Sequence, residues 1–308
     1  MATLSIQPVP LPTQQSPQSL PEGAAVLITP SVQPPFTAIR TLFDHLRSNP
    51  AAAASLNATY PKRGIFKSAA LTNKLSDQKF TIDLSPTRTS LIPATLRSSL
   101  APHGLEEVTS FFKSVVDNHV SDILSSLSQI AGVDISPLHA TKNINFRLCD
   151  YNPSTAAPLS ENGCGEHTDY GTFSIIFQDG QAGLELQDPL CPTTWHEIPG
   201  DATIILAGWC GYILSGGRVC AVRHRVRRMP GVRRLSAVLF VAPDLEVTLK
   251  PLVESDVRFS KEVMGGKVRV GWFKDVMGKR WRWREGNLEV EEGEGVVQDE
   301  EVGRLVFG

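Results

Sequence analysis

The apolar pattern changes once along this 308-residue chain, and the change limits the folds that the chain can adopt. Between about 104 and 131, apolar side chains recur at helical spacing and form one stripe, which Gly132 is placed to end. Short strand-like runs separated by turn residues then follow, at 144–148, 173–177, 183–187, 202–207, 221–226 and 235–241. Strands that succeed one another without helices between them predict an antiparallel sandwich or barrel rather than a parallel sheet. We therefore expect a mainly β protein with flanking helices, in which the long helix packs across a sheet as a scaffold.

Composition excludes several classes of protein. The formal net charge of −2 gives no general affinity for nucleic acid or an anionic membrane. Five cysteines without a Cys-x-x-Cys pair predict reduced thiols rather than a disulfide framework or a zinc site. Neither a signal-peptide pattern nor an apolar run long enough to cross a bilayer is present. The expectation is a cytoplasmic monomer that binds no membrane.

Four regions are expected along the chain. Residues 1–36 are rich in proline and predict a loosely ordered lead-in, and 37–140 predict a helical N-terminal region in which His119 lies on the surface. Residues 141–244 hold the strands and form the core. Residues 245–308 predict a helix near 268–279, two tryptophans that close part of the core, and an acidic tail.

The tripeptide His167-Thr168-Asp169 is the first candidate site. Taken alone, a His-x-Asp sequence is more often a surface turn than a metal site. Here it lies where a glycine-rich loop enters a strand, and residues two apart in an extended segment point to the same side. His224 shares the apolar face of a later strand with Val222 and Val226 and therefore points inward, which is also the ordinary position of a buried core histidine. Two imidazoles and one carboxylate together suit a mononuclear Fe(II) site with open positions.

A second candidate site follows ten residues after His224. Arg234-Leu235-Ser236 places a guanidinium and a hydroxyl on one face of a strand. A guanidinium holds a carboxylate through two parallel hydrogen bonds, which makes this pair suitable for a dicarboxylic acid.

Seven motifs in fixed order extend the pattern, and together they resemble a known family. They are Arg147-Leu148-Cys149-Asp150-Tyr151-Asn152-Pro153, Gly165-Glu166-His167-Thr168-Asp169-Tyr170-Gly171, Gly183-Leu184-Glu185-Leu186, Trp195-His196-Glu197-Ile198-Pro199-Gly200, Leu214-Ser215-Gly216-Gly217-Arg218, His224-Arg225-Val226, and Arg234-Leu235-Ser236 leading to Ala242-Pro243. From about residue 144 to 244 the chain resembles the iron(II)/2-oxoglutarate-dependent dioxygenases of plant and fungal natural-product metabolism, whose superfamily includes isopenicillin N synthase. The resemblance implies a double-stranded β-helix, or distorted jelly roll.

The resemblance also implies roles for single residues. His167, Asp169 and His224 become the iron ligands, Arg234 and Ser236 bind the far carboxylate of 2-oxoglutarate, and Tyr151 helps to hold it. The expected activity is oxidation of a small organic molecule in secondary metabolism by hydroxylation, desaturation or ring closure. It consumes O2 and yields succinate and CO2. The carboxylate of Asp169 argues against a halogenase, because related halogenases lack it.

Three alternatives remain open at this point. An oxidase like isopenicillin N synthase uses no 2-oxoglutarate but has the same Arg-x-Ser pair. A catalytically weak ligand-binding relative is suggested by Cys149, which stands where the family usually has asparagine, and by the absence from residues 1–40 of the family's Ile-Asp opening strand. Nucleic-acid binding is suggested by the arginines that crowd positions 218–234. The alternating positions of these arginines favour a solvated strand face instead.

Overall fold

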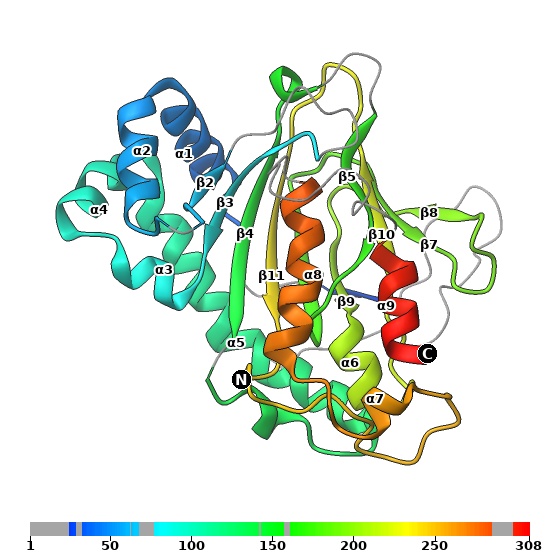
Figure 1. Cartoon of the computed structure of the whole chain (residues 1–308). Helices are drawn as coiled ribbons and strands as arrows, with labels where there is room; N and C mark the ends of the chain where they lie inside the picture. The colour runs from blue at the N-terminus through cyan, green and yellow to red at the C-terminus, as the bar shows by residue number, and fades with distance from the viewer. Residues whose placement is uncertain are drawn as a thin grey trace.

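Two antiparallel sheets lie face to face, with helices around them (Figure 1). The computed structural model describes residues 25–28, 33–61, 63–67, 77–141, 143–156, 161–284 and 298–308. Sheet pairing is antiparallel throughout these residues, and the flanking helices enclose the sheets as in a jelly roll. The expected fold class is confirmed.

The large sheet has seven strands. In spatial order they are β1 (Ala25–Ile28), β9 (Thr203–Ala207), β6 (Phe173–Gln178), β11 (Arg234–Val241), β4 (Ile144–Tyr151), β3 (Phe80–Leu84) and β2 (Phe66–Lys67). The small sheet has four strands, in the order β5 (Asn162–Thr168), β10 (Arg223–Arg227), β7 (Leu184–Gln187) and β8 (Trp195–Glu197). Because the strands of each sheet come from distant parts of the chain, residues far apart in sequence share one interior.

Strand β11 divides its side chains between two cores. Leu235 and Leu239 belong to the cluster that joins the large sheet to the N-terminal helices. Val238 belongs to the second cluster, which lies between the two sheets. Because side chains alternate along a strand, Arg234 and Ser236 share the inner face with Val238. Both polar side chains are buried there.

The outer face of the large sheet is covered by α5 (Leu105–Ala131), together with α1 (Phe36–Ser48) and α2 (Pro50–Ala58). Phe112 of α5 stacks on Phe146 of β4, with ring centroids 5.0 Å apart. The predicted scaffold helix is confirmed. The surface position expected for His119 is wrong, because this residue is 1% exposed. Its imidazole lies on the helix stripe that faces the core, and burial lowers its pKa.

Two more helices, α3 (Pro86–Leu91) and α4 (Ala94–Leu100), connect β3 to α5. The third core gathers the later helices, α6 (Trp209–Leu214), α7 (Lys261–Met264), α8 (Val270–Arg284) and α9 (Gln298–Phe307). The helix predicted near 268–279 is therefore α8. The expected acidic tail ends in α9, whose Val302 and Val306 are buried. The side chains of Trp281 and Trp283, expected to close the core, lie outside the described residues. No helix in the described part of the chain combines the length and apolarity needed to cross a bilayer.

All six predicted strands are present, with shifts of up to three residues at their ends. The other five described strands, β1, β2, β3, β5 and β8, were not among those predicted. Strand β5 contains His167 itself, β8 is only three residues long, and β1 lies inside the segment expected to be a loosely ordered lead-in. Strand β1 pairs with β9 at the sheet edge, although this segment lacks an Ile-Asp pattern. The division into four regions stays a prediction.

Candidate metal centre and carboxylate pocket

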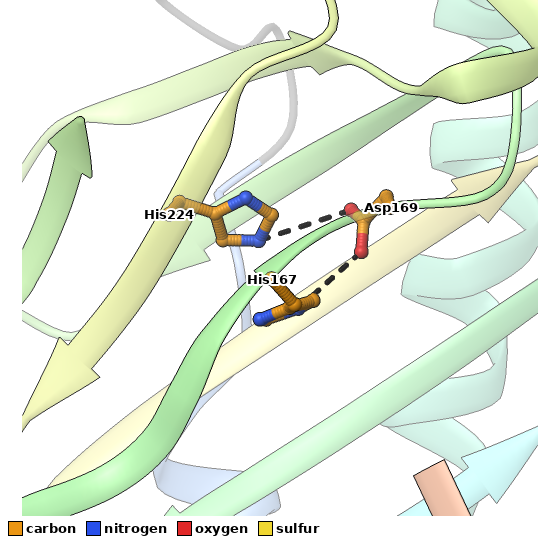
Figure 2. Close-up of side chains that lie close together, drawn as sticks. All are labelled: His167, Asp169 and His224. Atoms are coloured by element: carbon orange, nitrogen blue, oxygen red, sulfur yellow. Dashed lines mark ion pairs between the residues drawn. The ribbon is translucent and has the colours of Figure 1, made fainter. Parts of the chain in front are cut away.

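The small sheet brings the two candidate histidines face to face. His224 of β10 is the direct cross-strand partner of His167 of β5, and their ring centroids lie 4.2 Å apart. Asp169 follows the end of β5 and turns its carboxylate toward both rings (Figure 2). His167 Nε2 lies 3.5 Å from Asp169 Oδ1, and His224 Nε2 lies 4.0 Å from Asp169 Oδ2. The structure thus assembles all three residues predicted to bind the metal.

Backbone carbonyls hold each imidazole in one orientation. His167 Nδ1 lies 2.8 Å from the carbonyl oxygen of Gly165, and His224 Nδ1 lies 3.2 Å from that of Val222. A proton on Nδ1 satisfies each carbonyl and leaves Nε2 as the lone-pair donor, as in metal-bound histidines. Each Nε2 lies on the side of its ring that faces the carboxylate.

The carboxylate of Asp169 is buried and stays ionised. Burial alone raises its pKa, but His224, His167 and a hydrogen bond from the Ser174 hydroxyl together hold the pKa well below the usual range. Ser174 lies on the inner face of β6 and donates to Oδ2, which fixes the carboxylate beside the histidines. Ser174 is thus a supporting residue that the sequence motifs did not reveal.

The three residues fit a divalent transition metal. One donor atom from each residue lies within 4.8 Å of the others, and all three residues are buried. Two neutral imidazoles and one carboxylate on one side of an ion match the donor set of non-haem Fe(II) sites, which keep their remaining positions for ligands. The donor chemistry and the shared orientation of the rings therefore agree with the predicted iron centre.

Arg234 lies on the inner face of the large sheet with part of its guanidinium unused. Its Nη2 donates to Gln178 Oε1 at 2.8 Å, and its Nε donates to the Gln181 carbonyl at 3.2 Å. Nη1 is buried and has no hydrogen-bond partner among the described residues. A buried donor without an acceptor is costly, and a ligand carboxylate at this position removes that cost. The predicted carboxylate site therefore contains a buried N–H donor, Arg234 Nη1, that a ligand carboxylate can satisfy.

Ser236, Tyr151 and Cys149 share the inner face of the large sheet with Arg234. Tyr151 is the cross-strand partner of Arg234, and the Arg234 Cζ lies 5.2 Å from its ring centroid. Cys149 is the cross-strand partner of Ser236, so a buried thiol shares their inner face. The co-substrate role of Tyr151 stays a prediction.

One buried cation near Tyr151 was not predicted. Lys79 Nζ donates to Asp77 Oδ2 at 3.0 Å and to the Cys164 sulfur at 2.9 Å. Lys79 lies 5.8 Å from the centre of the Tyr151 ring. Nothing in the sequence around it signals burial.

Gln178, which holds Arg234, could have been found from strand parity, because it lies four residues after Ser174 on one face of β6.

The arginines of β10 are neutralised on the outer face of the small sheet. Arg223 and Arg225 both bind Glu166, at 3.1 and 2.9 Å. Arg225 also binds Glu185, and Arg227 binds Glu161. Paired arginines offer little free charge to phosphates. This arrangement removes the main support for nucleic-acid binding.

Comparison with known proteins agrees with this geometry. Residues 143–243 match the profile of the 2OG-Fe(II) oxygenase superfamily, and this segment contains both candidate sites. Over this region the chain is similar to the members of that superfamily. The predicted family is confirmed.

Similar oxygenases are found in plants and fungi. Over 160 residues the chain is 31% identical to scopoletin 8-hydroxylase of Arabidopsis thaliana, covering 50% of this chain and 43% of that protein. Over 156 residues it is 33% identical to the 2-oxoglutarate-dependent dioxygenase tropC of Talaromyces stipitatus, covering 50% of this chain and 41% of the relative. The chain thus matches less than half of the length of these oxygenases.

Solved oxygenases share the fold. The dioxygenase for auxin oxidation from rice aligns with a TM-score of 0.57 at 19% identity, over 92% of this chain and 90% of that one. The auxin dioxygenase 1 of Arabidopsis thaliana, in complex with 2-oxoglutarate, gives 0.57 at 20% identity, over 72% and 84%. At these identities the likeness describes the fold alone.

Proposed function

We propose that this protein is an Fe(II)- and 2-oxoglutarate-dependent dioxygenase that oxidises a small organic molecule. One observation supports the proposal most strongly. A buried His-Asp-His group and a buried arginine with a free donor occur inside the same pair of sheets. A metal site alone would suit many chemistries, but the added carboxylate receptor suits a dicarboxylic co-substrate.

Each residue has a physical task in this proposal. His167, Asp169 and His224 hold Fe(II), and Ser174 keeps the Asp169 carboxylate turned toward it. Arg234 and Ser236 receive the far carboxylate of 2-oxoglutarate. Burial of the whole site excludes bulk water, which strengthens every charge contact within it.

When bound, Fe(II) with 2-oxoglutarate and O2 supplies the oxidising power for C–H hydroxylation, desaturation or ring closure, with succinate and CO2 as co-products. A role in secondary metabolism is supported by the relatives. Among them are a scopoletin 8-hydroxylase and a feruloyl-CoA ortho-hydroxylase.

The proposal is tested in two measurements. Anaerobic addition of 2-oxoglutarate to the Fe(II)-loaded protein should give a visible metal-to-ligand charge-transfer band. Absence of the band would favour a weak ligand-binding relative. Succinate formed per O2 consumed is then measured with a panel of small molecules. Oxygen uptake without succinate would favour an oxidase like isopenicillin N synthase.

We also propose a cytoplasmic, monomeric protein. All five cysteines are free thiols, which is usual in a reducing compartment. Light scattering of the purified protein measures the oligomeric state.

A further inference from the structure

The inner face of the large sheet continues beyond the metal centre into a second polar region. Asn145 of β4 is paired with Phe240 of β11, which is paired in turn with Ser174 of β6. Residues directly opposite in a sheet share one face, so these three form a row across the interior. Neighbouring strands lie about 4.8 Å apart, which puts Asn145 about 10 Å from the serine that holds Asp169. Phe240 lies between them as an apolar floor.

Cations gather at the Asn145 end of this row. Arg147 and Lys67 both bind the buried Asp83, at 2.8 and 3.4 Å. Burial raises the pKa of Asp83, but Arg147, Lys67 and Arg88 together hold it far below its usual range. Arg147, Lys67 and Arg88 thus lie around one buried carboxylate.

Arg88 is fixed beside Asn145, and its buried Nε is unused. Its Nη1 donates to Asn145 Oδ1 at 2.7 Å, and its Cζ lies 4.8 Å over the ring of Tyr60. Its Nε is buried, and no hydrogen-bond acceptor for it occurs in the part of the chain that the structure describes. A guanidinium held on two sides keeps its remaining edge ready for a planar anion.

Lys274 of α8 brings another positive charge to the same place. Helix α8 lies in front of β4 and β11 (Figure 1). Lys274 Nζ donates to Asn143 Oδ1 at 3.1 Å and lies 5.9 Å from the ring centre of Tyr170, the residue after Asp169. Burial lowers the pKa of Lys274, and so do Arg63 and Arg88, whose effects exceed the opposing one of Asp275. An anion here would relieve the mutual repulsion of these cations.

From this arrangement we infer that the substrate of the proposed oxygenase carries an acidic group, a carboxylate, which binds between Arg88 and Lys274. The body of the substrate then lies over Phe240 and extends from Asn145 toward Ser174, about 10 Å away, so that its reacting carbon approaches the metal centre beside that serine. The inference rests on the proposed function. It adds a substrate class and two residues that determine specificity.

Matched acids and amides test the inference. The full chain, loaded anaerobically with Fe(II) and 2-oxoglutarate, is titrated calorimetrically with 4-phenylbutyrate, 2-naphthylacetate and their primary amides. At least one acid should bind about tenfold or more tightly than its amide, which is the usual gain from a charge-assisted contact. Lys274→Met should abolish that difference, and Lys274→Arg should retain most of it. Lys261→Met, at an exposed lysine on α7, is the matched control and should change nothing.

Three outcomes separate the possible failures. If each acid binds no better than its amide, or none of the four compounds binds, the inference is overturned. Preservation of the acid preference in Lys274→Met overturns the assigned site. The charge-transfer band reports separately on the proposed function, because Lys274 lies outside the groups that hold Fe(II) and 2-oxoglutarate. Absence of that band from the wild-type protein overturns the function whatever the titrations give.

Discussion

Replacement of Arg234 by methionine should separate ligand binding from folding. Methionine keeps most of the side-chain length but removes the charge and all five donors. In the unliganded protein the guanidinium makes two hydrogen bonds, to Gln178 and Gln181. Hydrogen bonds from a charged donor contribute about 1.5–3 kcal/mol each, but removal of the buried, unpartnered Nη1 offsets part of that loss, so the free energy of unfolding should fall by about 2–3 kcal/mol.

The effect on 2-oxoglutarate binding is expected to be at least as large. Removing one partner of a buried, hydrogen-bonded charge pair costs about 2–5 kcal/mol. At about 1.4 kcal/mol for each tenfold change, the dissociation constant should rise by about 30-fold to about 4000-fold. Anaerobic titration of the Fe(II)-loaded variant with 2-oxoglutarate, followed by the charge-transfer band, measures this constant. Urea unfolding measures the stability.

Arg228 provides a matched control. It is 9% exposed, and its guanidinium donates to the Gln78 carbonyl, the Thr155 hydroxyl and the Asn152 carbonyl. Arg228→Met leaves buried acceptors unsatisfied, so it should cost about 3 kcal/mol of stability or more while 2-oxoglutarate affinity stays within threefold. The reasoning fails if Arg234→Met binds 2-oxoglutarate as tightly as the wild type, or if both variants show the same pattern.

Three further predictions concern the metal centre and the charged row beside it. Alanine at any one of His167, Asp169 or His224 should abolish Fe(II)-dependent turnover with a circular dichroism spectrum unchanged from the wild type; turnover that survives all three changes contradicts the iron assignment. Ser174→Ala should weaken Fe(II) binding by about 10- to 100-fold, as loss of a supporting hydrogen bond usually does; an unchanged metal titration would show that Asp169 needs no support. Asp83→Asn should cost about 3–5 kcal/mol in urea unfolding, because it removes the buried carboxylate that binds Arg147 and Lys67. Since the folded-state pKa of Asp83 is lowered, its contribution to stability is complete above the unfolded pKa of about 3.9 and is lost progressively as pH falls from there toward the folded-state pKa. Two results would contradict this: a wild-type free energy of unfolding that does not change on acidification, or an Asp83→Asn variant as stable as the wild type.

The local spacing of apolar residues was sufficient to predict the scaffold helix and six strands. Residues 105–131 show one apolar stripe closed by Gly132, whose φ of 72° only glycine adopts without strain. The prediction misplaced His119 because it followed the polarity of the imidazole rather than its position on the helix. His119 lies within the buried stripe, four residues after Val115 and four before Ile123.

Strand β5 shows why the sequence pattern alone could not predict how the metal site is assembled. Its glycines and polar residues resemble a loop, and only pairing with β10 makes it a strand. That pairing puts His167 directly opposite His224, 57 positions later. The sequence offered the donor types, but a register shift of one residue would turn one histidine to the outer face.

From the sequence alone came the fold class, the three candidate ligands and the Arg-x-Ser pair, because alternation along a strand and the chemistry of side chains are local properties. Tertiary structure alone decided which atoms meet. The Ser174 hydroxyl donates to Asp169. Arg234 Nη2 donates to Gln178, while Nη1 has no partner among the described residues. Arg88 lies close enough to Lys274 to lower its pKa. These contacts join strands and helices that are distant along the chain, and their register and burial depend on the packing of the whole domain.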